Sequence, residues 1–172
     1  SAMKPNTLAL VAAAVLAAPP AFAQTASAAA APQAAPTSDW TLTANLGLFS
    51  DYRFRGISQT NRKPALQGGF DVSHKSGFYL GNWNSNVDSA MYNGANLEMD
   101  FYGGYKATFE GFGLDVGAIY YYYPGSGANG TLKIDNAELY IGGSYGPVSL
   151  KYNYAITDFF GAPDSKGSSY TD

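Results

Sequence analysis

The chain has 172 residues, the length of a single domain with room for a substantial core. Charged residues make up only 13% of it, against roughly 25% in soluble domains, and the net charge is −3. This balance leaves no basic surplus for a nucleic-acid partner, and the lack of cysteine excludes disulfides and thiolate metal sites. A mean hydropathy of −0.15 excludes a polytopic helical membrane protein but suits a membrane β-barrel, whose strands are apolar on one face only.

The start of the chain is typical of an export signal followed by a tether. Ser1–Ala2 resembles a cloning scar, and an early lysine, an apolar run over residues 8–18 and an A-x-A site follow it. We expect a signal peptide over residues 1–23, because this apolar run is too short for a transmembrane helix, which needs about 20 residues. Residues 24–39 are rich in alanine and proline, and we expect them to form a tether.

From Trp40 onward, apolar and polar residues alternate with a period of two, which predicts β-strands with one apolar and one polar face. No stretch has a sustained helical period. Taken at every second residue, the apolar rows are Trp40–Leu48, Leu66–Val72, Tyr79–Val87, Leu97–Ala107, Phe112–Tyr122, Ala137–Tyr145 and Val148–Ile156. In the third row, Tyr79 and Trp83 are expected on the apolar side and Asn82, Asn84 and Asn86 on the polar side.

The links between these rows alternate in length. Short turns are expected at His74–Gly77, Glu110–Gly111 and Gly146–Pro147, and long links at Phe54–Pro64, Asp88–Gly94, Pro124–Thr131 and Phe159–Tyr170. Short periplasmic turns alternating with longer outer loops are typical of an antiparallel up-and-down transmembrane β-barrel. Aromatic residues near the ends of the rows suit the headgroup layer of a membrane. A secreted soluble β-sandwich has similar faces and is kept as an alternative.

Four runs carry a family resemblance. They are FSDYRFRGISQTNRKPALQGG at Phe49–Gly69, GFYLGNWNSNVD at Gly77–Asp88, LEMDFYGGY at Leu97–Tyr105 and YNYAITDFFG at Tyr152–Gly161. Together they closely resemble the TorF-type porin family of proteobacteria, formerly classed as a conserved domain of unknown function. The resemblance spans the chain from about Trp40 to its end. It implies an outer-membrane barrel, regarded as a channel by analogy, and brings no substrate and no catalytic residues.

The barrel domain is expected over residues 40–172, with about seven strands. Bacterial single-chain barrels normally have an even number of strands. The last residues, Tyr170–Asp172, also lack the terminal aromatic strand of such barrels. We therefore expect a C-terminally truncated chain that lacks about three to five strands. Closure by a homo-oligomer is left open.

Charged and amide side chains on the polar faces are the candidate pore-lining residues. They are Asp71, Asn82, Asn84, Glu98, Asp100, Lys106, Asp115, Glu138 and Lys151. They are expected either to select solutes by charge or to pair with one another inside a narrow barrel. A second group of basic residues lies around the first long link: Arg53, Arg55, Arg62 and Lys63. These side chains are expected to attract anions, to bind lipopolysaccharide phosphates or to pair with Asp51.

Catalysis is not expected. The only histidine, His74, lies in a short turn, and the carboxylate pair Glu98 and Asp100 is weak evidence for glycoside chemistry. No cofactor and no metal are expected. The predicted function is passive diffusion of small polar solutes across the outer membrane, in contact with lipid and lipopolysaccharide. A non-conducting barrel for adhesion or envelope structure and a secreted β-sandwich are the alternatives.

Overall fold

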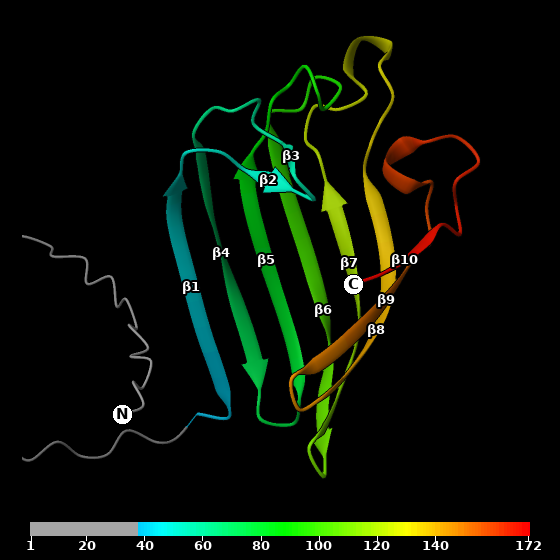
Figure 1. The fold of residues 1–172 in the computed structure, drawn as a ribbon. Helices are drawn as coiled ribbons and strands as arrows, with labels where there is room; N and C mark the ends of the chain where they lie inside the picture. Colours follow the sequence, from blue (N-terminus) through cyan, green and yellow to red (C-terminus); the bar gives the residue numbers. More distant parts are fainter. Residues whose placement is uncertain (1–37) are drawn as a thin grey trace, which may run out of the picture. The chain divides into compact units, whose positions relative to one another are not determined.

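The computed structural model describes residues 38–172, so the expected signal peptide and most of the tether lie outside the described part. Seven long strands carry the fold: β1 (Trp40–Phe49), β4 (Ala65–His74), β5 (Phe78–Asn86), β6 (Leu97–Phe109), β7 (Phe112–Tyr122), β8 (Asn136–Tyr145) and β9 (Val148–Ala155). A short strand, β10 (Ser169–Thr171), pairs with β9. The resulting eight-stranded sheet, in the order β1-β4-β5-β6-β7-β8-β9-β10, confirms the all-β antiparallel prediction (Figure 1).

The sheet is open in the described residues. Strands β1 and β10 lie at its two edges, each with one neighbour, so the closed barrel of the sequence prediction is not observed. The first long link adds a separate two-stranded hairpin, β2 (Arg53–Phe54) and β3 (Ile57–Ser58), which the sequence did not reveal. Its turn residues Arg55 and Gly56 both have positive φ, at 49° and 81°, as a two-residue hairpin turn requires.

Little of residues 38–172 is helical. Two short 3-10 turns, η1 (Ala128–Gly130) and η2 (Phe159–Gly161), lie in the last two long links. Among the described residues, no helix is long and apolar enough to span a membrane.

The two lengths of connection occur at opposite ends of the strands. Residues 75–77, 110–111 and 146–147 form short turns at one end, the turn end. Residues 50–64, 87–96, 123–135 and 156–168 form long links at the other, the loop end (Figure 1). The predicted alternation is thus present, and every strand pair joined by a short turn is a tight antiparallel hairpin.

Cross-strand pairing divides the side chains into an apolar face and a polar face, because directly opposed residues in an antiparallel pair share a face. Leu42 pairs with Val72, Phe101 with Tyr120 and Ile141 with Tyr152, and all six belong to the apolar face. That face is exposed: Leu46 is 78% exposed and Val148 is 68% exposed. No second sheet covers it in the described part of the chain.

Strand β5 is the exception to the predicted faces. Asn82 pairs with Phe70 and Phe101, so it lies on the apolar face, and Asn84 lies there as well. The expectation that these two side chains share the polar face with Asp71 and Glu98 is therefore wrong. The Asn84 Nδ2 group donates to the Gly68 carbonyl and that of Asn82 to the Asp100 carbonyl, so backbone oxygens accept from both amides on this face.

Tyrosine rings on the polar face pack over glycines of the neighbouring strand. Tyr79 is directly opposite Gly104, Tyr102 opposite Gly81, and Tyr140 opposite Gly117. A methyl group built on Gly117 would lie 2.5 Å from the Tyr140 hydroxyl and 2.5 Å from a backbone carbonyl oxygen. Glycine is therefore required at this position by the close approach of the ring.

We expect Gly117→Ala to lower the free energy of unfolding by about 1–3 kcal/mol, the usual range for overpacking. Gly142→Ala is the matched control on the same face, because its nearest neighbours would be 3.6 Å or more from the new methyl group. Urea unfolding of both variants in one detergent measures the difference. Equal stabilities for the two variants would contradict this packing.

Candidate functional site

Tyrosine hydroxyls hold the aspartates in the middle of the polar face. The Tyr102 hydroxyl donates to Asp71 Oδ1 at 2.6 Å, and the Tyr79 hydroxyl donates to Asp115 Oδ1 at 2.5 Å. Tyr140 reaches the Tyr79 hydroxyl from β8. Hydrogen bonds to charged acceptors are stronger than neutral ones, so this row fixes both carboxylates in place.

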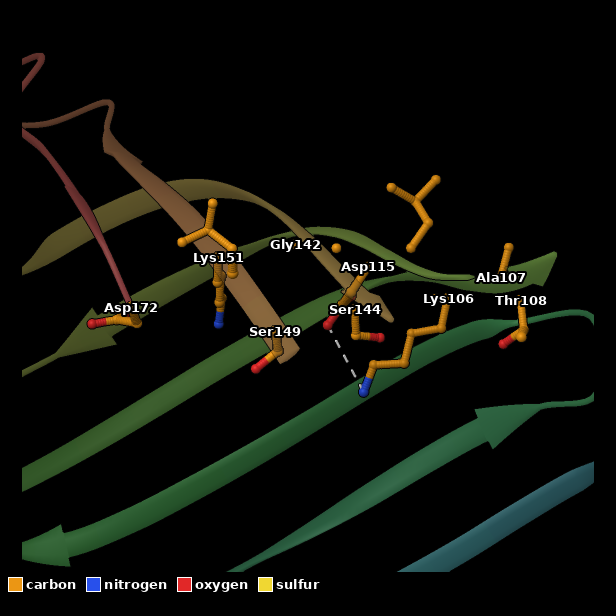
Figure 2. A pocket seen from close by; sticks show the side chains of 13 residues that line it. Lys106, Ala107, Thr108, Asp115, Gly142, Ser144, Ser149, Lys151 and Asp172 are labelled. Carbon is orange, nitrogen blue, oxygen red and sulfur yellow. Dashed lines mark ion pairs between the residues drawn. The ribbon is translucent and has the colours of Figure 1, made fainter. Parts of the chain in front are cut away.

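Two lysines extend this row toward the turn end, beside an open cavity of about 500 Å³ (Figure 2). Lys106 Nζ lies 3.9 Å from Asp115 Oδ2 and 4.6 Å from the centre of the Tyr79 ring. Lys151 Nζ lies 4.2 Å from the centre of the Tyr140 ring. Both lysines are exposed, so this half of the polar face presents two ammonium groups to water beside the partly exposed carboxylates of Asp71 and Asp115.

The first long link is organised around Asp51. Its carboxylate accepts from the Ser58 hydroxyl at 2.5 Å and the Thr60 hydroxyl at 3.0 Å, and it pairs with Arg53 at 2.8 Å. The hydrogen bond from Ser58, helped by Thr60 and Arg53, lowers the pKa of Asp51 below its usual range. These contacts give Asp51, Ser58 and Thr60 of the run SDYRFRGISQT a structural role in the first long link.

The long links pack against one another at the loop end. Lys63 pairs with Asp88 at 3.3 Å, which joins the first link to the second. The Asn93 amide donates to the Leu132 carbonyl at 3.0 Å, which joins the second link to the third. A small buried cluster of Ala95, Tyr123 and Ile134 lies beneath these contacts, with Tyr92, Tyr121 and Phe160 packed against it.

A cavity of about 470 Å³ lies beside this cluster, and all four long links contribute to it. Its walls are mostly aromatic: Tyr52, Phe54, Tyr92, Tyr121, Tyr123, Phe159, Phe160 and Tyr170. Arg55 also lines it, with its guanidinium 4.6 Å from the centre of the Tyr170 ring. We call this space the aromatic cavity.

Two carboxyl groups of β6 enter the aromatic cavity. Glu98 is 4% exposed and Asp100 is 8% exposed, and both side chains line the cavity. Glu98 Oε2 and Asp100 Oδ1 have no hydrogen-bond partner. Glu138, also buried, differs from them because it accepts from the Tyr170 hydroxyl and the Asn136 amide, each at 2.7 Å.

Glu98 and Asp100 affect the pKa of three tyrosines in the long links. Burial raises the pKa of Tyr52, and the charges of Glu98 and Asp100 raise it further. Burial and the same two charges also raise the pKa of Tyr92 and of Tyr123. All three hydroxyls therefore stay protonated at neutral pH and remain hydrogen-bond donors beside the acids.

A metal centre is not indicated by the side chains present. Within residues 38–172, no three His, Cys, Asp or Glu side chains gather as a metal ion would require. The aromatic cavity supplies two carboxyl groups only.

Comparison with known protein families gives a match that covers most of the chain. Residues 33–172 match the model of a family described as "Bacterial protein of unknown function (Gcw_chp)". The chain belongs to this family. Neither a curated protein nor a solved structure matches the chain significantly. The porin character implied by the resemblance is not part of the Gcw_chp description and stays a prediction.

In this Gcw_chp chain, the candidate pore-lining residues fall into three groups. Glu98 and Asp100 lie in the aromatic cavity, and Glu138 lies next to it beneath Tyr170. Asp71, Lys106, Asp115 and Lys151 lie on the same polar face nearer the turn end. Asn82 and Asn84 lie on the opposite face.

The basic residues of the first long link do not form one patch. Arg53 pairs with Asp51, one of the pairings expected from the sequence. Arg55 pairs with Asp172 at 3.0 Å, and Lys63 pairs with Asp88. The Arg62 backbone N–H donates to the Ser58 hydroxyl. Three of the four residues thus have separate acidic partners.

The sequence did not single out the tyrosines of this site. Tyr79, Tyr102 and Tyr140 each lie opposite a glycine, and Tyr52 and Tyr123 come from the long links. The signal that could have revealed the three strand tyrosines is a tyrosine on the polar face of one strand directly opposite a glycine of the next strand. The cavity residues outside the strands offered no comparable pattern.

Removing the Tyr79 hydroxyl tests whether the tyrosine–aspartate row stabilises the sheet. We expect Tyr79→Phe to lower the free energy of unfolding by about 1–3 kcal/mol, because Asp115 loses a charge-assisted hydrogen bond. Tyr105→Phe is the control, since Tyr105 lies on the apolar face opposite Phe78. Thermal unfolding in detergent compares the two. If both variants unfold at the wild-type temperature, the row does not stabilise the sheet.

Proposed function

We propose that this chain is the wall of an outer-membrane β-barrel that lets small polar solutes diffuse along its polar face. The exposed apolar face carries the proposal. Leu42, Leu80 and Ile141, from three separate strands, are each more than half exposed on that face. Soluble monomers rarely expose apolar patches larger than a few hundred Å². Hydrocarbon is the solvent in which such a face is stable.

The distribution of charge supports the same orientation. Asp71, Lys106 and Asp115 all lie on the polar face, where they would meet water inside a barrel. Short turns at one strand end and long links at the other agree with the periplasmic and outer ends of such barrels. The export signal expected over residues 1–23 would direct the chain to the envelope.

The two alternatives are a soluble β-sandwich and a non-conducting barrel, and they differ in what would cover the apolar face. A soluble β-sandwich would cover it with a second sheet, and none lies on it in residues 38–172. A non-conducting barrel is favoured by one observation, the interlocking of the long links through Lys63–Asp88 and Asn93–Leu132. Such packing would narrow the outer mouth of a barrel, so conduction is the property that separates the two barrel functions.

Conduction is tested with the full-length protein of the gene in a planar lipid bilayer. We expect stepwise conductance, and we expect Lys106→Glu to shift the reversal potential in a salt gradient toward cation selectivity. The reason is that a lumen charge sets the local concentration of permeant ions.

Lys75→Glu is the matched control, because it makes the same charge change in the turn between β4 and β5, where Lys75 pairs with Asp39. Its reversal potential should stay close to the wild-type value. Absence of conductance at any voltage would favour the non-conducting barrel. Equal shifts for the two variants would contradict a permeation path along the polar face.

A further inference from the structure

The aromatic cavity holds two buried acids that form no ion pair with any basic side chain in residues 38–172. Four of the six basic side chains in the long links pair with other acids: Arg53 with Asp51, Arg55 with Asp172, Lys63 with Asp88 and Lys133 with Asp135. The other two, Arg62 and Lys166, are exposed. No ion pair in residues 38–172 includes Glu98 or Asp100. A buried carboxylate without a partner is costly, so a cation entering the cavity would relieve that cost.

The walls of the cavity suit a cation with an apolar body. Aromatic faces attract cations through their quadrupole, and cages of such rings recognise quaternary ammonium groups. The rings of Tyr92 and Tyr123 stack with their centres 5.0 Å apart, and the ring centres of Tyr121 and Phe160 are 5.2 Å apart. Arg55 over Tyr170 shows that a ring of this cavity already holds a cationic group.

The same walls do not suit a bare divalent metal. Calcium takes six to eight oxygen ligands and magnesium demands octahedral geometry. The cavity offers two carboxyl groups with one open oxygen each, Glu98 Oε2 and Asp100 Oδ1. Its volume of about 470 Å³ is instead within the range of small-molecule sites.

We propose that the aromatic cavity binds a small organic ammonium cation. The ammonium group contacts the open oxygens of Glu98 and Asp100, and its alkyl substituents pack against the rings of Tyr92, Tyr123 and Phe160. This inference rests on the proposed function, because the bound cation is one of the polar solutes that diffuse along the polar face. Binding itself does not require conduction, so the two are measured separately.

The test is isothermal titration calorimetry of the full-length protein in detergent micelles, with choline as the probe. Its uncharged carbon isostere, 3,3-dimethylbutan-1-ol, has the same shape without the charge. We expect choline to bind at least tenfold more tightly than the isostere. Equal affinities, or no binding of choline, would overturn the inference without any variant having to fold.

A pair of variants assigns the binding to this cavity. The double variant Glu98→Gln with Asp100→Asn keeps the side-chain shapes and should weaken choline binding at least tenfold. Glu110→Gln, which removes an exposed carboxylate at the turn end of β6, should leave the affinity unchanged. Unchanged affinity in the double variant would overturn the assignment. If the protein conducts ions but does not bind choline, this inference is wrong and the proposed function is not contradicted.

Discussion

The arrangement of this molecule depends on one constraint: a single sheet has an apolar face that no other part of residues 38–172 covers. Burying a leucine, isoleucine or phenylalanine side chain is worth about 1.5–3 kcal/mol, so leaving such a row in water would be very unfavourable. Under the proposed function, hydrocarbon takes the place of a second layer. The polar side chains then have to form hydrogen bonds with one another on the opposite face. The edge strands also have to be paired, because unpaired backbone groups are costly in hydrocarbon.

The polar face meets that demand by pairing large rings with glycines. A tyrosine opposite a glycine lies flat enough for its hydroxyl to reach an aspartate on another strand, as Tyr79 reaches Asp115. Bulkier residues at Gly104 or Gly117 would push the rings away and break the row. Part of the glycine and tyrosine content of the chain therefore follows from these three tyrosine–glycine pairs. At the loop end, one oxygen of each buried acid, Glu98 Oε2 and Asp100 Oδ1, is left without a hydrogen-bond partner.

Much of the fold follows from the sequence because strand faces and turn lengths are local properties. Six of the seven rows have the predicted face, and β5 fails because Tyr79 and Trp83 were counted as apolar. The short turn before β5 sets Ser73 opposite Tyr79, so the register through that turn would have placed Leu80 and Asn82 on the apolar face. The β2–β3 hairpin is too short for a periodic signal. The aromatic cavity depends on contacts between distant links, such as Arg55 with Tyr170, and no local pattern encodes those.

The central claim, that the apolar face contacts lipid, is tested most directly by spin labels along β8. The chain has no cysteine, so single cysteines at positions 137–145 can each carry a nitroxide label in liposomes. If the apolar face contacts lipid, the accessibility of the labels should alternate with a period of two. Labels at Ala137, Leu139, Ile141 and Gly143 should collide mainly with oxygen, which dissolves in lipid, and labels at the polar-face positions Gly142 and Ser144 mainly with a water-soluble nickel complex. Equal access of the nickel complex to both sets would contradict the account.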